Sequence, residues 1–415
     1  MASRGSQGLV LQRHGHRGQT VLALGLDDVR YLRSDAGKRA CDEVAGYRLT
    51  GPTLVADISA ARKRFADRAA VVVETVMLRR KAAAKFADVA DVSEWLFTDE
   101  ALQQATAGPV AQHRAQRLAG ATVHDATCSI GTELAALRDC ADLVLGSDID
   151  PVRLAMAGHN LGLGGAPVTL CRADALRPVT ADAVVVVDPA RRSGSRRRFD
   201  PGAYVPPLDR LLEVLQRRDY VVKCAPGVDF AVLRQLGFAG EVEVTSLAGS
   251  VREACLWSPG LADTSVHRRA TILDNAEQIT DADPDHCRVG PAGRWIVDPD
   301  GAVVRAGLVR HYGTRHDLWQ LDRDIAYLSG DRLPDGVRGF EVLEQLPFSE
   351  RNLRRALSAR AVGAVEILVR GVDLDPDALR ARLRLRGSTQ LTVVIARLGS
   401  GPASRATAFV CRPSR

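Results

Sequence analysis

Residues 121–137, ATVHDATCSIGTELAAL, decide the fold, because a short β-rich run there passes through a turn into a helical pattern. Runs of the same kind follow, separated by helical stretches. They are ADLVLGSD (141–148), PVTLCRAD (167–174), AVVVVD (183–188), YVVKCA (220–225) and EVEVTSL (241–247). This alternation is typical of parallel strands joined by helical crossovers, so we predict an α/β domain. The first four runs reach an aspartate, and ligands bind beyond the carboxyl ends of such strands.

The turn after the first run indicates the class of cofactor. A dinucleotide pyrophosphate normally requires a G-x-G-x-x-G turn, and of its glycines only Gly131 is present. S-adenosylmethionine (SAM) has no phosphate and presents a cationic sulfonium and ammonium, which suit a carboxylate at the strand end. Asp125 occupies that place, and Gly131 lets the chain pass close to the ligand. The sequence therefore predicts SAM binding.

Two further strand ends support this prediction. Asp148, followed by Ile149, stands 23 residues after Asp125, about the spacing at which an acid hydrogen-bonds ribose hydroxyls. Asp174, followed by Ala175, ends the third strand, where a side chain can reach the adenine edge. A single aspartate after a strand is more often a turn former or a helix N-cap. The prediction therefore rests on the joint order and spacing of these acids.

Composition sets broader limits. The chain has 415 residues, enough for two or three domains. Its net charge of +6 favours an anionic partner such as nucleic acid, although a modest arginine excess also serves solubility. The eight cysteines form no C-x-x-C pair, so we predict neither a metal site nor disulfides, which fits a reducing cytosol. No apolar run approaches 18 residues, so we expect a cytoplasmic protein without a membrane partner.

We predict three regions along the chain. Residues 1–120 are a flexible leader and a helical region, because residues 56–89 carry apolar positions at helical spacing without Pro or Gly. Residues 121–263 form the SAM-binding domain. Residues 264–415 form a smaller α/β domain, entered through a strand-like stretch (294–309) and a helical stretch (317–330). From 340 to 412 this domain reads strand, helix, strand, helix, strand, strand.

The chain resembles a known family, the bacterial class I SAM-dependent methyltransferases that carry a C-terminal THUMP-like domain. The matching stretches are LRRKAAAKF (78–86), WLFTDEALQQAT (95–106), VHDATCSIGTEL (123–134), GSDIDPVRLAMA (146–157), RADAL (172–176), VVVDPARR (185–192), FEVLEQLPFSERNLRRAL (340–357) and AVEILVRG (364–371). They span nearly the whole chain. The resemblance implies a Rossmann-like methyltransferase domain between an N-terminal helical region and a small THUMP-like α/β domain.

The cofactor turn departs from the usual methyltransferase pattern D-x-x-x-G-x-G. Ser129 replaces the first glycine, and Cys128 lies beside it in the predicted cofactor site. A more distant similarity is to trimethylguanosine synthase, and it implies that Phe97, Thr98 and Thr106 help to cover SAM from the N-terminal side. The alternative for Phe97 is a place in the hydrophobic core.

The residues after the fourth strand are predicted to position the methyl acceptor. Nitrogen-methylating relatives place an acid or amide, two prolines and an aromatic there. This chain has Asp188-Pro189-Ala190-Arg191, which keeps the carboxylate and lacks the aromatic. We predict that Asp188 orients the acceptor beside Pro189, and that Arg191 stacks on a base or binds phosphate. Further charge follows at Arg192, Arg196, Arg197 and Arg198, although these residues are also compatible with a solvated basic loop.

A rival chemistry is attack by a cysteine, as in the RNA uracil-C5 methyltransferases. Cys224 follows the fifth strand, and the neighbouring Lys223 could lower its thiol pKa. However, a lone cysteine at a strand end is usually a small buried residue, and no SCNP-type motif adjoins it. We therefore predict Lys223 as a contact to substrate or cofactor.

THUMP domains in relatives dock structured RNA. The two predicted helices of the C-terminal domain carry several arginines that are suited to phosphate contacts. The alternative is that these arginines only form solvated helix faces. They are Arg354, Arg355, Arg382, Arg384 and Arg386. We predict an RNA methyltransferase that acts on a base nitrogen. The alternatives are a methyltransferase for a small molecule or a protein, and a SAM- and RNA-binding protein that has lost catalysis.

Overall fold

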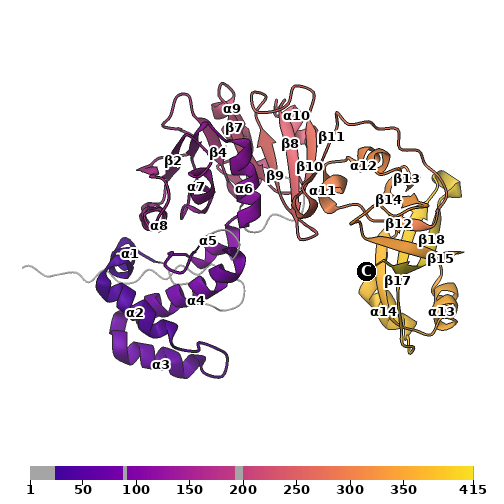
Figure 1. Ribbon diagram of the computed structural model, residues 1–415, viewed down its shortest axis with the longest axis horizontal. Helices are drawn as coiled ribbons and strands as arrows, with labels where there is room; N and C mark the ends of the chain where they lie inside the picture. Colours follow the sequence, from indigo (N-terminus) through magenta and orange to yellow (C-terminus); the bar gives the residue numbers. More distant parts are fainter. Residues whose placement is uncertain (1–23, 87–90, 192–199, 415) are drawn as a thin grey trace, which may run out of the picture. The chain divides into compact units, whose positions relative to one another are not determined.

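The computed structural model describes residues 24–86, 91–191 and 200–414, with only the backbone of Arg191. Two compact units make up the chain. The first comprises Met1–Phe238 with Cys255–Leu261, and the second comprises Ala239–Ala254 with Ala262–Arg415 (Figure 1). The units are divided differently from the three predicted regions, whose boundaries stay predictions. The predicted leader and the predicted basic loop at Arg192, Arg196, Arg197 and Arg198 lie outside the described residues.

The first unit opens with helices, as the apolar spacing predicts. They are α1 (Leu26–Arg33), α2 (Asp35–Ala45), α3 (Leu54–Phe65), η1 (Ala66–Arg68), α4 (Ala69–Phe86), α5 (Asp99–Gln104) and α6 (Gly108–Arg117). The break between α3 and α4 lies at Ala66, whose φ of 50° is left-handed. Helices α1 to α5 share one apolar core, to which Met156 and Ile130 of the following domain also belong. The helical region is therefore packed directly against the α/β fold that follows it.

All six predicted strands are present. They are β1 (Thr122–Asp125), β2 (Leu143–Asp148), β3 (Thr169–Arg172), β4 (Val184–Val187), β7 (Tyr220–Cys224) and β8 (Glu241–Leu247). Within the first unit the order is β3-β2-β1-β4-β7-β9, and the five strands from β3 to β7 pair in parallel. The order reverses at β1, so the carboxyl ends of β1, β2 and β4 lie side by side. This edge holds the predicted site.

Helices join these strands, and the last strand leads into the second unit. The helices are α7 (Thr132–Leu137), α8 (Pro151–Leu161), α9 (Leu208–Leu215) and α10 (Phe230–Gln235); the short strands β5 (Ala190–Arg191) and β6 (Tyr204–Val205), with η2 (Pro201–Ala203), lie after β4. Strand β9 (Ser250–Trp257) contributes residues 250–254 to the second unit and 255–257 to the first. A two-residue turn, with positive φ at Ala248 and Gly249, connects β8 to β9.

The second unit begins with β8, which pairs in parallel with β10 (Arg268–Ile272). The elements that follow are η3 (Leu273–Asn275), β11 (Glu277–Thr280), α11 (Gly301–Arg305) and α12 (Val309–Arg315). Strand β10 carries Arg269, which makes two hydrogen bonds with the fully buried Glu241 of β8. Part of the predicted strand-like stretch 294–309 is wrong, because Asp300 caps α11 through the Ala302 N–H at 2.7 Å.

A second sheet follows in the order β13-β14-β12-β15-β18-β17-β16. Its strands are β12 (Trp295–Val297), β13 (Trp319–Asp322), β14 (Ile325–Gly330), β15 (Gly339–Pro347), β16 (Val362–Arg370), β17 (Thr389–Leu398) and β18 (Arg405–Pro413), with η4 (Gly401–Ala403) before the last. Helices α13 (Glu350–Ser358) and α14 (Pro376–Leu383) share an apolar core with it (Figure 1). The predicted order from 340 onward is confirmed. The helix predicted at 317–330 is wrong, since β13 and β14 form a hairpin there.

The described part of the chain offers neither a metal-ligand cluster nor a helix that could cross a membrane. Its residues include no group of three His, Cys, Asp or Glu side chains arranged to hold a metal ion. None of its helices is both long enough and apolar enough to cross a membrane. All eight cysteines lie among the described residues, and none of them forms a disulfide bond there.

Candidate functional site

The turn from β1 to α7 is shaped by two residues with positive φ. Gly131 has a φ of 88°, and a Cβ added there would lie 3.2 Å from the Leu161 side chain. Ser129 has a φ of 48°, a conformation that favours glycine. This explains why the usual pattern has glycine there. Cys128 is buried under the turn, where burial first and the charge of Asp125 second raise the pKa of its thiol.

Asp125 ends β1 as a buried carboxyl. Its side chain accepts the Thr127 N–H at 3.0 Å and is 3% exposed. Burial, followed by the nearby Glu133 carboxylate, raises the pKa of Asp125 to about 8. A cation placed beside this group would favour its ionised form.

Asp148 ends β2 and organises the neighbouring backbone. One oxygen accepts the N–H of Ser129 and the other accepts the N–H of Asp150, both at 2.9 Å. The next side chain, Ile149, is 63% exposed and presents an apolar surface at the same edge. Asp174 follows β3, is exposed and accepts the Leu176 N–H, and the adjacent Ala175 is buried.

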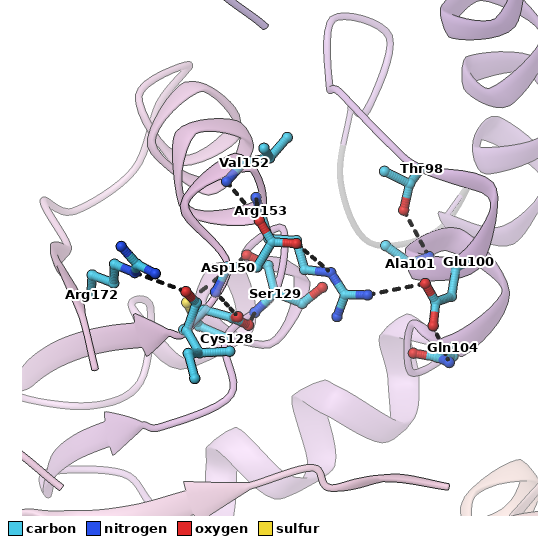
Figure 2. A network of polar contacts seen from close by, with 12 residues as sticks. Thr98, Glu100, Ala101, Gln104, Cys128, Ser129, Asp150, Val152, Arg153 and Arg172 are labelled. Carbon is cyan, nitrogen blue, oxygen red and sulfur yellow. Dashed lines mark hydrogen bonds and ion pairs between the residues drawn. The ribbon is translucent and has the colours of Figure 1, made fainter. Parts of the chain in front are cut away.

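Figure 2 shows how this edge is tied to helix α5. Asp150 caps α8 through the Val152 N–H at 2.8 Å. Arg153, on the first turn of α8, lies 3.7 Å from the Asp150 carboxylate and 3.1 Å from the Glu100 carboxylate on α5. Thr98 caps α5 by accepting the Ala101 N–H at 3.1 Å. Helix α5, which lies between the predicted cover residues Thr98 and Thr106, is thus connected to the first turn of α8 by an ion pair.

Phe97 has an identifiable structural role. Its ring is buried and stacks against Phe86 and Trp95, with centroids 6.4 and 6.1 Å away. These contacts fit the core alternative, and the predicted contact of Phe97 with SAM stays a prediction. The same holds for Thr98, whose hydroxyl caps a helix.

On the predicted acceptor side, a lysine of β7 contacts one residue that follows β4 and one that follows α5. The Lys223 ammonium at the end of β7 lies 2.5 Å from Asp188 Oδ2 and 2.5 Å from Thr106 Oγ1. The Asp188 N–H donates to Thr127 Oγ1 at 2.7 Å, which joins the ends of β4 and β1. The Asp188 side chain remains 45% exposed, whereas that of Lys223 is 9% exposed. The structure therefore brings together Thr106, Asp188 and Lys223, which lie far apart in the sequence.

Two charged residues that were not among the predicted site residues are connected to Lys223, Glu133 directly and Arg114 through Glu133. Glu133 on α7 is 3.8 Å from the Lys223 ammonium. Its carboxylate accepts Nε and Nη2 of Arg114 on α6 at 2.8 and 2.9 Å. Burial opposes the charge of Glu133, but Arg114 and Lys223 outweigh it and lower its pKa. The sequence does contain a signal that Arg114 is buried. It lies four residues after Val110, which places it on the apolar face of its helix.

The other predicted acceptor-site residues are placed as follows. Pro189 is buried beside Asp188, and the side chain of Arg191 lies outside the described residues. Cys224 is 7% exposed, as expected for a packed thiol. The five predicted phosphate-binding arginines of the second unit are all exposed, and Arg382 also bonds Glu350 at 2.8 Å.

The residues at this edge fit SAM by their chemistry. Asp125 is a buried acid that a cation would ionise, and each Asp148 oxygen keeps acceptor capacity beyond its single backbone bond. Ile149 offers an exposed apolar side chain for the adenine. When bound, SAM supplies an electrophilic methyl group, and these residues would hold its charged, hydroxyl and aromatic parts.

Comparison with known proteins agrees with this chemistry. The chain is 67% identical over 357 residues to uncharacterised S-adenosylmethionine-dependent methyltransferases of Mycobacterium tuberculosis strains CDC 1551 and H37Rv, covering 85% of this chain and 100% of each relative. Residues 337–413 match a THUMP domain-like family, and residues 25–82 match a domain of unknown function (DUF8688).

A solved structure supports the fold. The crystal structure of a Porphyromonas gingivalis W83 protein superposes with a TM-score of 0.70 at 18% identity, covering 94% of this chain and 98% of that one. The similarity to trimethylguanosine synthase finds no support among these comparisons. The chain belongs to the S-adenosylmethionine-dependent methyltransferases, with a C-terminal THUMP-like domain.

Proposed function

We propose that this methyltransferase acts on a base nitrogen in RNA and that Asp188 holds the acceptor. The observation that carries the proposal is the Lys223 ammonium, 2.5 Å from one oxygen of a half-exposed Asp188 carboxylate. In this ion pair the Asp188 carboxylate can only accept hydrogen bonds. The acceptor must then carry an N–H or O–H that donates to Asp188.

An amino or ring nitrogen meets this requirement without a strong base. When the nitrogen gains the methyl group it loses a proton, and Asp188 can accept that proton or pass it to water. Most of the rate comes from holding the nitrogen in line with the methyl carbon. The bond from the Asp188 N–H to Thr127 and the lysine contact both restrict the carboxylate, so they support a positioning role.

RNA as the substrate is supported by the second unit. Its residues 337–413 are THUMP-like, and its helices α13 and α14 expose arginines suited to phosphate. The net charge of +6 is compatible with an anionic partner. A target base would have to be unpaired or flipped to reach Asp188.

The experiment is methyl transfer from labelled SAM into total RNA of a strain that lacks this protein, followed by nucleoside mass spectrometry. We expect the wild-type protein to produce one methylated base in this RNA. The Asp188→Asn variant should not produce it, although its SAM affinity should be unchanged. Cys224→Ser is the matched control, because it alters a neighbouring strand-end residue and should retain full activity. Label in protein or small molecules but not in RNA would contradict the proposal.

RNA binding at two salt concentrations gives a second check. Phosphate contacts release counterions, so the affinity for RNA should fall as salt rises. SAM binding without salt-sensitive RNA binding would favour a small-molecule or protein substrate. Tight RNA binding with SAM affinity but no transfer would favour a binding protein without catalysis.

A further inference from the structure

The strongest feature that the proposed function does not use is the buried ion pair between Arg114 and Glu133. Arg114 is 2% exposed at its side chain and Glu133 is 9% exposed. Two hydrogen bonds, at 2.8 and 2.9 Å, give the parallel arginine–carboxylate geometry. A third guanidinium nitrogen donates to Cys255 Sγ on β9 at 3.2 Å. The pair thus connects α6, α7 and β9.

Burying two charges is expensive, and apolar side chains of similar size often stabilise a core as well or better. A buried pair is therefore weak evidence for a stability role. The pair has a second consequence here, because Glu133 also lies 3.8 Å from the Lys223 ammonium.

The contacts connect Lys223 to the α6 region in two ways, through Thr106 and through Glu133. Lys223 is hydrogen-bonded to Thr106, which lies two residues before Gly108, the first residue of α6, and Arg114 lies within that helix. Glu133 contacts both Arg114 and Lys223, and so provides the second connection. The Lys223 ammonium is therefore held by Thr106 ahead of α6 and by Glu133 on α7, and it in turn contacts Asp188.

We propose that Glu133, oriented by Arg114, is a positioning residue that holds the Lys223 ammonium against Asp188. This inference rests on the proposed role of Asp188 in holding the acceptor. Neither Arg114 nor Glu133 needs to touch the substrate. Their loss should reduce turnover while cofactor affinity is kept.

The first test measures Lys223 directly, without any substrate. An acylating reagent modifies free lysine amines, and mass spectrometry of the 223-containing peptide gives the rate for this side chain. We expect Glu133→Gln to raise that rate about tenfold over wild type, the equivalent of losing one charge-assisted contact. An unchanged rate in a folded variant would overturn the inference.

The matched control is Glu241→Gln. Glu241 forms the same kind of buried pair with Arg269, at 2.8 and 3.1 Å, but on strands β8 and β10 of the second unit. Its loss should lower the unfolding midpoint as much as Glu133→Gln does. Acylation of Lys223 should stay at the wild-type rate.

A double variant removes the pair without leaving a buried charge. Arg114→Met with Glu133→Met should keep the fold, since both charges leave together. We expect Lys223 to become reactive and transfer to RNA to fall about 100-fold in turnover, with SAM affinity within about threefold of wild type. Wild-type turnover in the folded double variant would overturn the inference. If wild type itself transfers no methyl to RNA, the proposed function fails while acylation still decides the inference.

Discussion

The acids at the cofactor edge and the acid at the acceptor position are held in two different ways. Asp125, Asp148 and Asp174 accept backbone N–H groups from residues only two positions away, or from the adjoining turn in the case of Ser129. The Asp188 carboxylate is held by a side chain, Lys223, which contacts residues of two other elements.

This difference predicts separable effects of substitution. A carboxylate held by local backbone depends on the turn that carries it, so changes elsewhere should leave cofactor binding intact. A carboxylate held through a lysine depends on every residue that places the ammonium. Substitutions on the acceptor side should therefore lower turnover, and those on the cofactor side should lower SAM affinity.

The largest effect is expected for Lys223→Met. This change removes the cation beside Asp188 and leaves the buried Glu133 carboxylate with Arg114 as its cationic contact. We expect transfer to fall about 100-fold, because a misplaced positioning group costs about that much. Single-turnover kinetics with saturating SAM would measure it.

If Lys223→Met also abolished SAM binding, substitutions on the acceptor side and the cofactor side would not have separable effects. Isothermal titration of SAM provides that control, with Thr106→Val as a milder variant. Thr106→Val removes the hydroxyl that lies 2.5 Å from the ammonium and leaves the lysine charge in place. Turnover for it should lie between wild type and Lys223→Met.

On the cofactor side the largest effect is expected for Asp148→Ala. Two backbone N–H groups lose their acceptor, and the ribose loses its predicted partner. One charge-assisted bond contributes about 2 kcal/mol, so the SAM dissociation constant should rise about 30-fold. Asp174→Ala is the control, because that exposed side chain accepts one backbone N–H and should cost less. Equal losses in the two variants would contradict the assignment of Asp148.

The pH dependence of SAM binding tests Asp125. Its pKa of about 8 means that the free protein carries a proton there at neutral pH, and a bound cation favours its release. Affinity should therefore rise about 20-fold between about pH 6.5 and pH 8.5. Without SAM the sign for stability is opposite, since the raised pKa stabilises the folded chain at low pH and this contribution is lost as the pH rises toward 8. Asp125→Asn should remove both dependences.

The acids of the cofactor edge could be selected from the sequence because each follows a predicted strand and accepts the N–H of the residue two positions later. Asp125, Gly131 and Asp148 appear at fixed spacing in a pattern that recurs. The contact between Thr106 and Lys223 spans 117 residues, and that between Arg114 and Glu133 spans 19 across two helices. Spacing along the chain carries no information about such pairs, so Lys223 was predicted as a contact without its partners and Glu133 was missed.

Secondary structure that depends on distant pairing is likewise difficult to predict from the sequence. Buried strands such as β4, with four consecutive valines, are unambiguous. The stretch 317–330 has apolar residues that fit either period, and the turn after Asp322 decides the outcome. Its carboxylate accepts the Asp324 N–H at 3.0 Å, which closes a hairpin between β13 and β14. The strands then pair within a sheet whose other members lie far along the chain, so tertiary pairing overrode the helical reading.

The smallest effect is expected within the cofactor turn itself, for Ser129→Gly. Relief of the left-handed backbone at φ 48° should stabilise the turn by about 1 kcal/mol, but the added freedom of glycine in the unfolded chain offsets most of this. The net change in unfolding free energy should be under about 1 kcal/mol, measured from urea unfolding midpoints. Gly131→Ala should be clearly destabilising, because its φ is 88° and the new Cβ would lie 3.2 Å from Leu161. If Ser129→Gly cost as much as Gly131→Ala, the serine hydroxyl would have to stabilise the turn, and the backbone would not be its only contribution to the cofactor edge.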